Sequence, residues 1–311
     1  MTPGHLGYLG CMQGRLTAGA HRARSELAGM LPIGGASEVV GVPASTIRGW
    51  EQRDGLVVGR LSERGERRYS EVDLAALGRM RDELAAGRTA AEAAALVNAT
   101  LSATPTELSA ALLAAAHRFD SAGVLEVLDR SSWLHGLGAT VDDVLFPALR
   151  EIGSRWAQRE WDVAQEHLAS TTVQGWLRAQ HQRRARMLPP GWVVVLGCGP
   201  EEQHTLGLDA LAALLAEEGL TSLNLGANTP ASSLKAAVRQ VAPCAVVVSC
   251  HVVSGRPASV CALQALIDTS ARLYYAGAAF STEATRRAVP GTYLGSSLAR
   301  AAGLLAAQTA S

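Results

Sequence analysis

The carboxyl-terminal third of the chain, from residue 191 onward, alternates short apolar runs with stretches of helical periodicity. Four runs have the length and residue types of buried strands, and they lie at residues 192–196, 222–225, 245–249 and 273–276. Helical patterns separate them, at about residues 207–218, 230–241, 257–270 and 281–288. Such alternation predicts a parallel, doubly wound sheet, which binds its ligands beyond the carboxyl ends of its strands.

The connection after the first predicted strand contains the pattern E-x-H-x-x-G, formed by Glu202, His204 and Gly207. Because it directly follows that strand, it lies at the ligand-binding edge of the sheet. An imidazole in a loop, with a carboxylate two residues before it, suits a metal ligand whose tautomer the carboxylate fixes. We therefore expect His204 to bind a metal and Glu202 to orient its ring.

The composition is that of an ordinary globular protein with room for two or three domains, since 48% of the 311 residues are hydrophobic and 18% are charged. The formal net charge is zero, so any affinity for nucleic acid must come from a local patch. No apolar stretch reaches the roughly 20 residues that span a bilayer, and the N-terminus lacks the apolar core of a signal peptide. The five cysteines have no C-x-x-C spacing, which favours reduced thiols and a cytoplasmic location. Residues 1–30 are glycine-rich and are predicted to form a flexible extension.

The segment at residues 31–97 has the order of parts of a winged helix-turn-helix. Two short helical patterns flank a glycine turn, and a hairpin-like stretch follows them. Ser45 can cap the second helix, whose Ile47 and Trp50 we expect in the core. Between Arg48 and Tyr69 there are six arginines and four acidic residues. This excess is too small to establish DNA binding by charge alone.

The same segment resembles the DNA-binding domain of MerR-type regulators. The resemblance rests on T-I-R-x-W-E at residues 46–51, on the G-L pair that enters the wing, and on R-R-Y-S at residues 67–70. It implies that the second helix enters the major groove and that wing residues contact phosphates. The residues that it assigns to the DNA contact are Thr46, Arg48, Arg60, Arg67, Arg68 and Tyr69.

Residues 107–187 carry apolar positions three and four apart without strand-like runs, which predicts a bundle of about four helices after a linker at residues 98–106. Within the bundle, Trp156 is followed by Glu166 and His167 in the pattern W-x9-E-H. Each of these residues alone is typical of a core or surface position. Together, a flat aromatic ring, a carboxylate and an imidazole can cover one face of a planar cofactor.

The whole order of parts is similar to that of the CarH/LitR-type, cobalamin-dependent photoreceptor regulators, from about residue 32 to the end. The resemblance implies a multi-domain fold: an N-terminal winged helix-turn-helix, a central four-helix bundle, and a C-terminal Rossmann-like α/β domain at residues 191–311 with a doubly wound parallel sheet. It also implies adenosylcobalamin as the cofactor, operator DNA as a partner, and a homo-oligomer that is a tetramer in the dark and dissociates in light.

The resemblance gives roles to residues on both faces of the cobalamin. His204 would be the lower cobalt ligand, with Glu202 orienting it. Trp156 would cover the upper face and Glu166 would contact the adenosyl group. His167 would become the upper cobalt ligand once light has cleaved the cobalt–carbon bond.

Three further residues would accommodate the tail of the cofactor: Gly207, Ser249 and Gly277. The family often has two glycines at the turn after the fourth strand, where this chain has Ala276 before Gly277. We expect the extra methyl group to be tolerated, because Gly277 keeps most of the flexibility of the turn.

The function implied by the resemblance is a light-relieved repressor, not an enzyme, that controls carotenoid or other photoprotection genes. Two alternatives stay open. The chain can be a light-independent regulator that senses cobalamin, or the corrinoid shuttle protein of a methyltransferase, which shares the bundle-plus-sheet architecture. W-x9-E-H favours the light response, because a simple metabolite sensor needs no replacement upper ligand. The helix-turn-helix argues against the enzyme.

Overall fold

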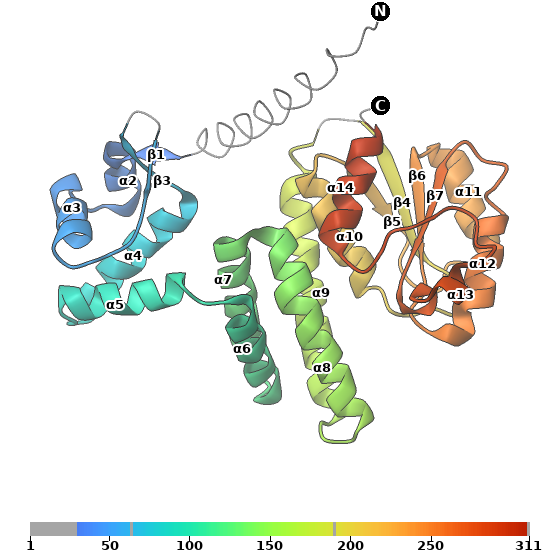
Figure 1. The fold of residues 1–311 in the computed structure, drawn as a ribbon, viewed down its shortest axis with the longest axis horizontal. Coiled ribbons are helices and arrows are strands. Elements are labelled where there is room, and N and C mark those ends of the chain that lie inside the picture. Colours follow the sequence, from blue (N-terminus) through green and yellow to red (C-terminus); the bar gives the residue numbers. More distant parts are fainter. Residues whose placement is uncertain (1–29, 63–64, 189–190, 310–311) are drawn as a thin grey trace, which may run out of the picture. The chain divides into compact units, whose positions relative to one another are not determined.

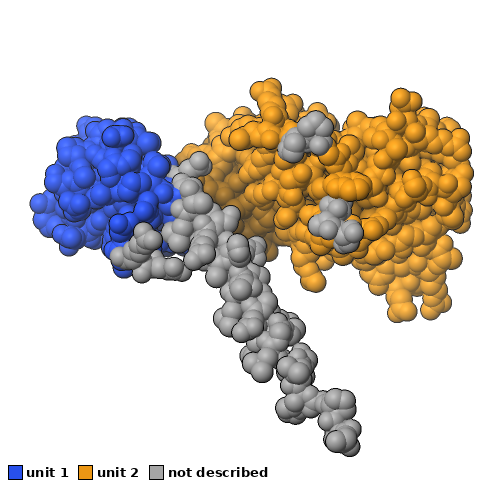
Figure 2. Space-filling view, turned by 90° about the horizontal axis from the view of Figure 1, so that it is seen from above, with its two compact units in different colours: residues 1–103 blue, residues 104–311 orange. Residues whose placement is uncertain are grey.

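The structure is a computed structural model that describes residues 30–309, apart from residues 63–64 and 189–190. The chain forms two compact units, residues 1–103 and 104–311 (Figure 2). The extension expected at residues 1–30 lies, except for Met30, outside the described residues. Among the described helices, none is long and apolar enough to cross a membrane.

The first unit combines short helices with a small antiparallel sheet (Figure 1). Its strand β3 (Arg67–Tyr69) pairs with both β1 (Leu31–Pro32) and β2 (Arg60–Leu61). The helices are α2 (Ile33–Val40), α3 (Ala44–Gln52), α4 (Glu71–Ala85) and α5 (Ala90–Leu101). Helices α2 and α3, followed by the β2–β3 hairpin, form the expected winged helix-turn-helix.

The core of this unit contains Ile47 and Trp50, as predicted. The predicted cap of α3 is wrong, however. Pro43 occupies the N-cap position and its carbonyl accepts hydrogen bonds from the backbone of Thr46 and Ile47. Ser45 therefore lies inside the first turn, where its side chain is exposed and caps nothing.

The linker predicted at residues 98–106 is mostly helical, because α5 continues to Leu101 and the next helix begins at Pro105. The Asn98 side chain explains the extension of α5. Its amide nitrogen donates to the carbonyl of Gly55 at 2.8 Å, and its oxygen accepts the backbone N–H of Val57 at 2.9 Å. These tertiary contacts hold Asn98 inside α5, although the local preference of an asparagine is for a helix end.

The second unit begins with the predicted four-helix bundle. It comprises α6 (Pro105–His117), α7 (Ser121–Ala139), α8 (Phe146–Ala157) and α9 (Val163–Ala185), with a π-helical segment, η1 (Thr140–Leu145), before α8. The side chains of Thr104, Asp120 and Asp162 accept backbone N–H groups at the starts of α6, α7 and α9. These capping bonds explain where the three helices begin.

The predicted doubly wound sheet follows the bundle. Its parallel strands lie in the order β5-β4-β6-β7-β8, and they are β4 (Val193–Cys198), β5 (Thr221–Asn224), β6 (Ala245–Ser249), β7 (Arg272–Ala276) and β8 (Thr292–Tyr293). The short β8 was not predicted. Its two residues are too few to give an alternating pattern.

Helices cover both faces of the sheet (Figure 1). On one face, α10 (Leu206–Glu217) and α14 (Leu298–Thr309) share a core with the bundle. On the other lie α11 (Ala231–Val241) and α12 (Arg256–Gln264), which ends before the predicted residue 270. The helix expected at 281–288 shortens to α13 (Glu283–Arg286).

The shared core positions α9 against α10, which covers one face of the sheet. The connection between α8 and α9 extends beyond the end of the sheet at which β4, β6 and β7 finish (Figure 1). Residues of the bundle therefore lie on the side of the sheet where ligands bind in folds of this class.

Candidate functional site

The loop between β4 and α10 holds the side chain of His204 against that of Glu202. Nδ1 of His204 lies 2.5 Å from Oε1 of Glu202, and the backbone N–H of His204 donates to the same oxygen at 2.9 Å. The second oxygen, Oε2, accepts the backbone N–H groups of His251 and, at 2.9 Å, of Val252. Glu202 is fully buried, whereas 58% of the His204 side chain is exposed.

These hydrogen bonds decide the ionisation of Glu202. Burial by itself raises the pKa of this carboxyl group, but the bonds from Val252, His204 and His251 outweigh it and lower the pKa to about 2. The ionised carboxylate accepts a hydrogen bond from the Nδ1–H group of His204. That leaves the lone pair of Nε2, on the exposed side of the ring, as the atom that can ligate a metal.

A metal on His204 must bring most of its own ligands. Among the described residues, no group of three or more histidine, cysteine, aspartate or glutamate side chains is arranged to hold a metal ion, and Glu202 already has its hydrogen-bond partners. A corrinoid would fit this donor set, because its ring would supply the other ligands of the metal and His204 would supply the one imidazole.

The strand ends next to this loop supply the remaining predicted residues. Ser249 ends β6 and pairs in register with Ala276, whose side chain packs against the core. Gly277 has a φ of 106°, and a Cβ there would lie 2.1 Å from the carbonyl oxygen of Cys250, so the turn requires glycine. At Gly207 a Cβ would meet no atom within 4 Å. Packing within the chain therefore does not require glycine there, and the space is open to a ligand.

Sequence reasoning missed His251. Its ring centroid lies 4.8 Å from that of His204, and its backbone N–H helps to hold Glu202. The next residues, Val252 and Val253, expose apolar surface beside it. Its position in the sequence could have indicated it. His251 comes two residues after the end of β6, and therefore lies at the same edge of the sheet as His204.

The first turns of α9 carry Glu166 and His167, whose side chains lie 3.6 Å apart. His167 is 71% exposed. Gln174 lies seven residues farther on, and therefore on the same face of the helix. Its amide donates to the hydroxyl of Thr205 at 3.0 Å, so this face of α9 is directed toward the loop that holds His204. His167 lies along the same face, about 10 Å beyond Gln174.

Trp156 lies in the last turn of α8 with 49% of its surface exposed. The connection that follows Trp156 leads to α9, whose first turns carry Glu166 and His167. No hydrogen bond or ring contact among the described residues joins Trp156 to either of them. The indole is thus an exposed apolar surface at the ligand-binding end of the unit.

In the first unit, Thr46 and Arg48 are exposed on α3 and Arg60 is exposed on β2. Two of the predicted wing contacts have acidic neighbours. Arg67 lies 3.2 Å from Glu51 and Arg68 lies 2.9 Å from Glu66. The pair of Arg68 and Glu66 is partly exposed and therefore weak, so Arg68 remains available to phosphate. Glu51, in contrast, is nearly buried, and Arg67 also donates to the carbonyl of Val58 at 3.3 Å, so Arg67 is held by contacts within the unit.

The expected contact of Tyr69 with DNA is wrong for this structure. The side chain is fully buried, and its hydroxyl donates to Oε1 of Glu51 at 2.9 Å. Burial raises the pKa of Tyr69. The residue alternates in β3 with the more exposed Arg68 and faces the core, where it ties the wing to α3.

The comparison with known families divides the chain in the same way. Residues 31–100 match the MerR HTH family regulatory protein, and residues 108–179 match the B12 binding domain. Among solved structures, the monomethylamine corrinoid protein of Methanosarcina barkeri has a TM-score of 0.55 at 13% identity, and the match covers 66% of this chain and all of that one. This likeness shows a common fold.

Two curated relatives from Myxococcus xanthus each match about two thirds of the chain. The HTH-type transcriptional repressor CarH is 31% identical over 224 residues, which cover 67% of this chain and 74% of CarH. The HTH-type transcriptional repressor CarA is 32% identical over 221 residues, with 68% and 74% covered. Together with the two domain matches, they show that the chain belongs to the CarH/CarA family of MerR-type regulators and is a cobalamin-binding regulator of transcription.

Proposed function

We propose that the protein binds adenosylcobalamin with His204 as the lower cobalt ligand, represses transcription in the dark and releases its operator in light. The observation that carries the proposal is the exposed imidazole of His204, held through Nδ1 by the buried carboxylate of Glu202. With Nδ1 engaged, Nε2 alone can bind the cobalt. The open space at Gly207 leaves room for the cofactor at the first turn of α10.

The residues of the W-x9-E-H pattern would act on the upper face. Adenosylcobalamin supplies, when bound, a cobalt–carbon bond that light breaks. Trp156 has apolar surface to bury against the adenosyl group, and Glu166 can accept hydrogen bonds from its hydroxyls. His167 is mostly exposed, so its ring can turn to the upper cobalt position at little cost to packing once that position is free.

The contacts of Trp156 and Glu166 would differ between dark and light, and this difference biases the conformation of the protein. Burying one large apolar side chain contributes roughly 1.5–3 kcal/mol. Moving an equilibrium from 1:99 to 99:1 needs about 5.5 kcal/mol. About two to four protomers that switch together reach this difference, in agreement with a homo-oligomer, for which we propose a dark tetramer.

Assembly also gives the winged helix its affinity. One such module offers only a few contacts, chiefly those of Thr46, Arg48 and the wing arginines, so tight operator binding at physiological salt needs several modules together. Both curated relatives are named repressors. Loss of assembly in light would free the operator, and carotenoid or other photoprotection genes are the proposed targets.

The test uses the purified full chain loaded with adenosylcobalamin in the dark. Its absorption spectrum, its size by gel filtration and its operator affinity are measured before and after green light. We expect a spectral change, a smaller species and weaker operator binding after illumination. The same size and operator affinity in both samples would refute the light response.

A light-independent cobalamin sensor is the second candidate function. The pair of His204 and Glu202 favours it, because lower ligation is indifferent to the group on the upper face. Hydroxocobalamin distinguishes the two. A sensor of cobalamin binds its operator equally well with either cofactor form, whereas the photoreceptor requires the adenosyl form. We propose no enzymatic activity for either.

A further inference from the structure

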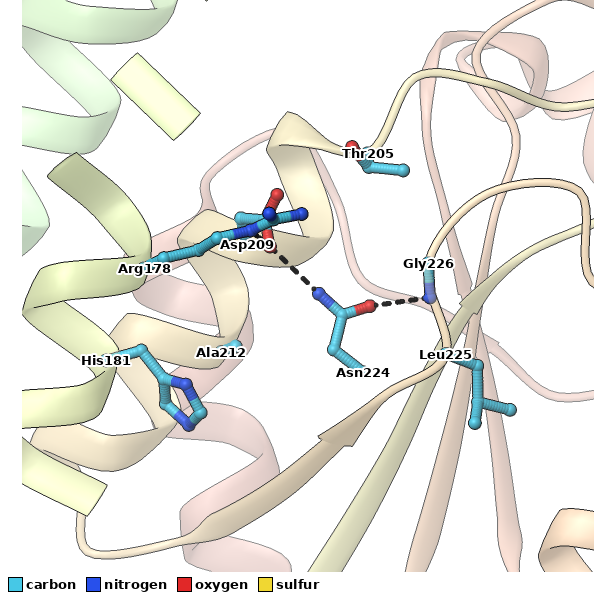
Figure 3. Close-up of a pocket in the computed structure, with 8 residues that line it drawn as sticks. All are labelled: Arg178, His181, Thr205, Asp209, Ala212, Asn224, Leu225 and Gly226. Atoms are coloured by element: carbon cyan, nitrogen blue, oxygen red, sulfur yellow. Dashed lines mark hydrogen bonds and ion pairs between the residues drawn. The ribbon is translucent and has the colours of Figure 1, made fainter. Parts of the chain in front are cut away.

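A cavity of about 390 Å³, lined by both polar and apolar residues, lies where α9 meets α10 and the end of β5 (Figure 3). One of its walls is formed by Asp209, a buried residue in the first turn of α10. Figure 3 shows Arg178 of α9 and Asn224 of β5 on either side of this carboxylate. The cavity lies at the β5 edge of the sheet, whereas Ser249 ends β6 and Gly277 follows β7.

Asp209 joins three elements through its side chain. Oδ2 accepts the amide N–H of Gln174 on α9 at 2.9 Å. Oδ1 accepts from the amide of Asn224 at 3.1 Å and faces Nε of Arg178 at 3.4 Å. A carboxylate near a helix N-terminus is stabilised by the helix dipole, and these donors satisfy it in a buried position. Asp209 is therefore a fixed anchor for α9.

Gln174 also contacts the loop that holds His204. Besides Asp209, its amide donates to the hydroxyl of Thr205 at 3.0 Å, and Thr205 directly follows His204 in the chain. Each of the two amide hydrogens thus has its own acceptor. The side chain of Gln174 therefore connects the loop that holds His204 to α9, the helix that carries Glu166 and His167.

Apolar packing alone does not define this connection. The interface of α9 and α10 is largely apolar, with Leu177, Leu208 and Leu211 in a common core. Apolar contacts are non-directional, so they keep the helices together but leave sliding along the axis weakly constrained. The two hydrogen bonds of Gln174 have defined lengths and directions, and they set the position of α9 along that axis.

We propose that Gln174 is a positioning residue, which sets the gap between the His204 loop and the first turns of α9. The inference rests on the proposed function, because it takes His204 as the lower ligand and α9 as part of the upper cover. A cobalamin with a large upper group contacts both sides of this gap. A cobalamin whose upper group is only a hydroxyl depends for its affinity chiefly on contacts with the His204 side.

The experiment compares Gln174→Ala and Gln174→Met with the wild-type full chain. Met keeps the length and apolar stem of the side chain but removes the donors, so both variants test the hydrogen bonds. We expect dark adenosylcobalamin to bind about tenfold more weakly, the effect of one or two lost hydrogen bonds, and hydroxocobalamin to change less than about twofold. Gln182→Ala, at an exposed position of the same helix, is the matched control and should leave both affinities unchanged.

Equal weakening of both cobalamins, or no change in either, would overturn the positioning role. A wild-type protein that binds no adenosylcobalamin contradicts the proposed function instead. In that case the positioning role is tested by amide hydrogen exchange in the cofactor-free protein. Residues 203–206 and 166–170 should exchange faster in Gln174→Ala than in Gln182→Ala, and equal rates in the two variants would overturn the inference.

Discussion

The two sides of the candidate cobalamin site are built in opposite ways. Below, the ring of His204 is oriented by Glu202, and Glu202 by backbone groups from two loops. On the upper side, Trp156 is half exposed and His167 is mostly exposed. Under the proposed function, this difference would give a rigid lower half that holds the cofactor and an adaptable upper half that responds to its upper group. Substitutions on the His204 side should therefore alter the affinity for every cobalamin. Substitutions on the upper side should alter only the discrimination between cobalamins with different upper groups.

The largest effect is expected for His204→Ala. It removes the ligand itself, so affinity for adenosylcobalamin and hydroxocobalamin should both fall by at least about 100-fold, more than the loss of an orienting partner causes. Absorption titration measures both. His251→Ala is the control for the neighbouring ring, with an expected change below about threefold. A His204→Ala protein that binds as tightly as the wild type would contradict lower ligation.

Glu202→Gln should have the next largest effect. The amide can offer one oxygen where the carboxylate offers two, so either the imidazole or the backbone of residues 251–252 loses its acceptor. Affinity for both cobalamins should fall roughly 10–100-fold, as for other partners of metal-ligating histidines. Glu201→Gln, at the adjacent exposed position, is the matched control. If the two variants bind equally well, Glu202 does not orient the ligand.

Trp156→Ala should distinguish the contribution of the upper side of the site to binding from that of the lower side. Removal of the aromatic cover is expected to weaken dark adenosylcobalamin about fivefold, with hydroxocobalamin unaffected. Trp192→Ala, at another exposed tryptophan outside the site, serves as the control in the same titration. A parallel loss for both cofactors would mean that Trp156 supports the fold and does not discriminate upper groups.

The smallest effect on dark binding is expected for His167→Ala, because the ring is exposed and is needed only after illumination. Dark affinity for adenosylcobalamin should stay within about twofold of wild type, since exposed substitutions cost little. The absorption spectrum after green light should differ from that of the wild type. His181→Ala, on the same face of α9, should keep the wild-type spectrum. Identical spectra for His167→Ala and wild type would exclude His167 as the upper ligand.

Much of the fold was predictable because it follows from local periodicity. The four main strands and the bundle were found from the spacing of apolar residues. Errors arose where tertiary contacts decided the outcome. Tyr69 was expected at DNA but is buried against Glu51, and Asn98 was expected in a linker but is held in α5 by Gly55 and Val57.

The sequence by itself determined the contact between Glu202 and His204, because residues two positions apart in a loop meet through local geometry. It also determined that His167 and Gln174 share a face of α9, because the helical repeat brings every seventh residue to the same side. Only the tertiary structure decided what completes the site. The pairing of β4 with β6 brings His251 to Glu202, and the packing of α9 on α10 brings Gln174 to Thr205. Such contacts join residues tens of positions apart, and no local pattern encodes their meeting.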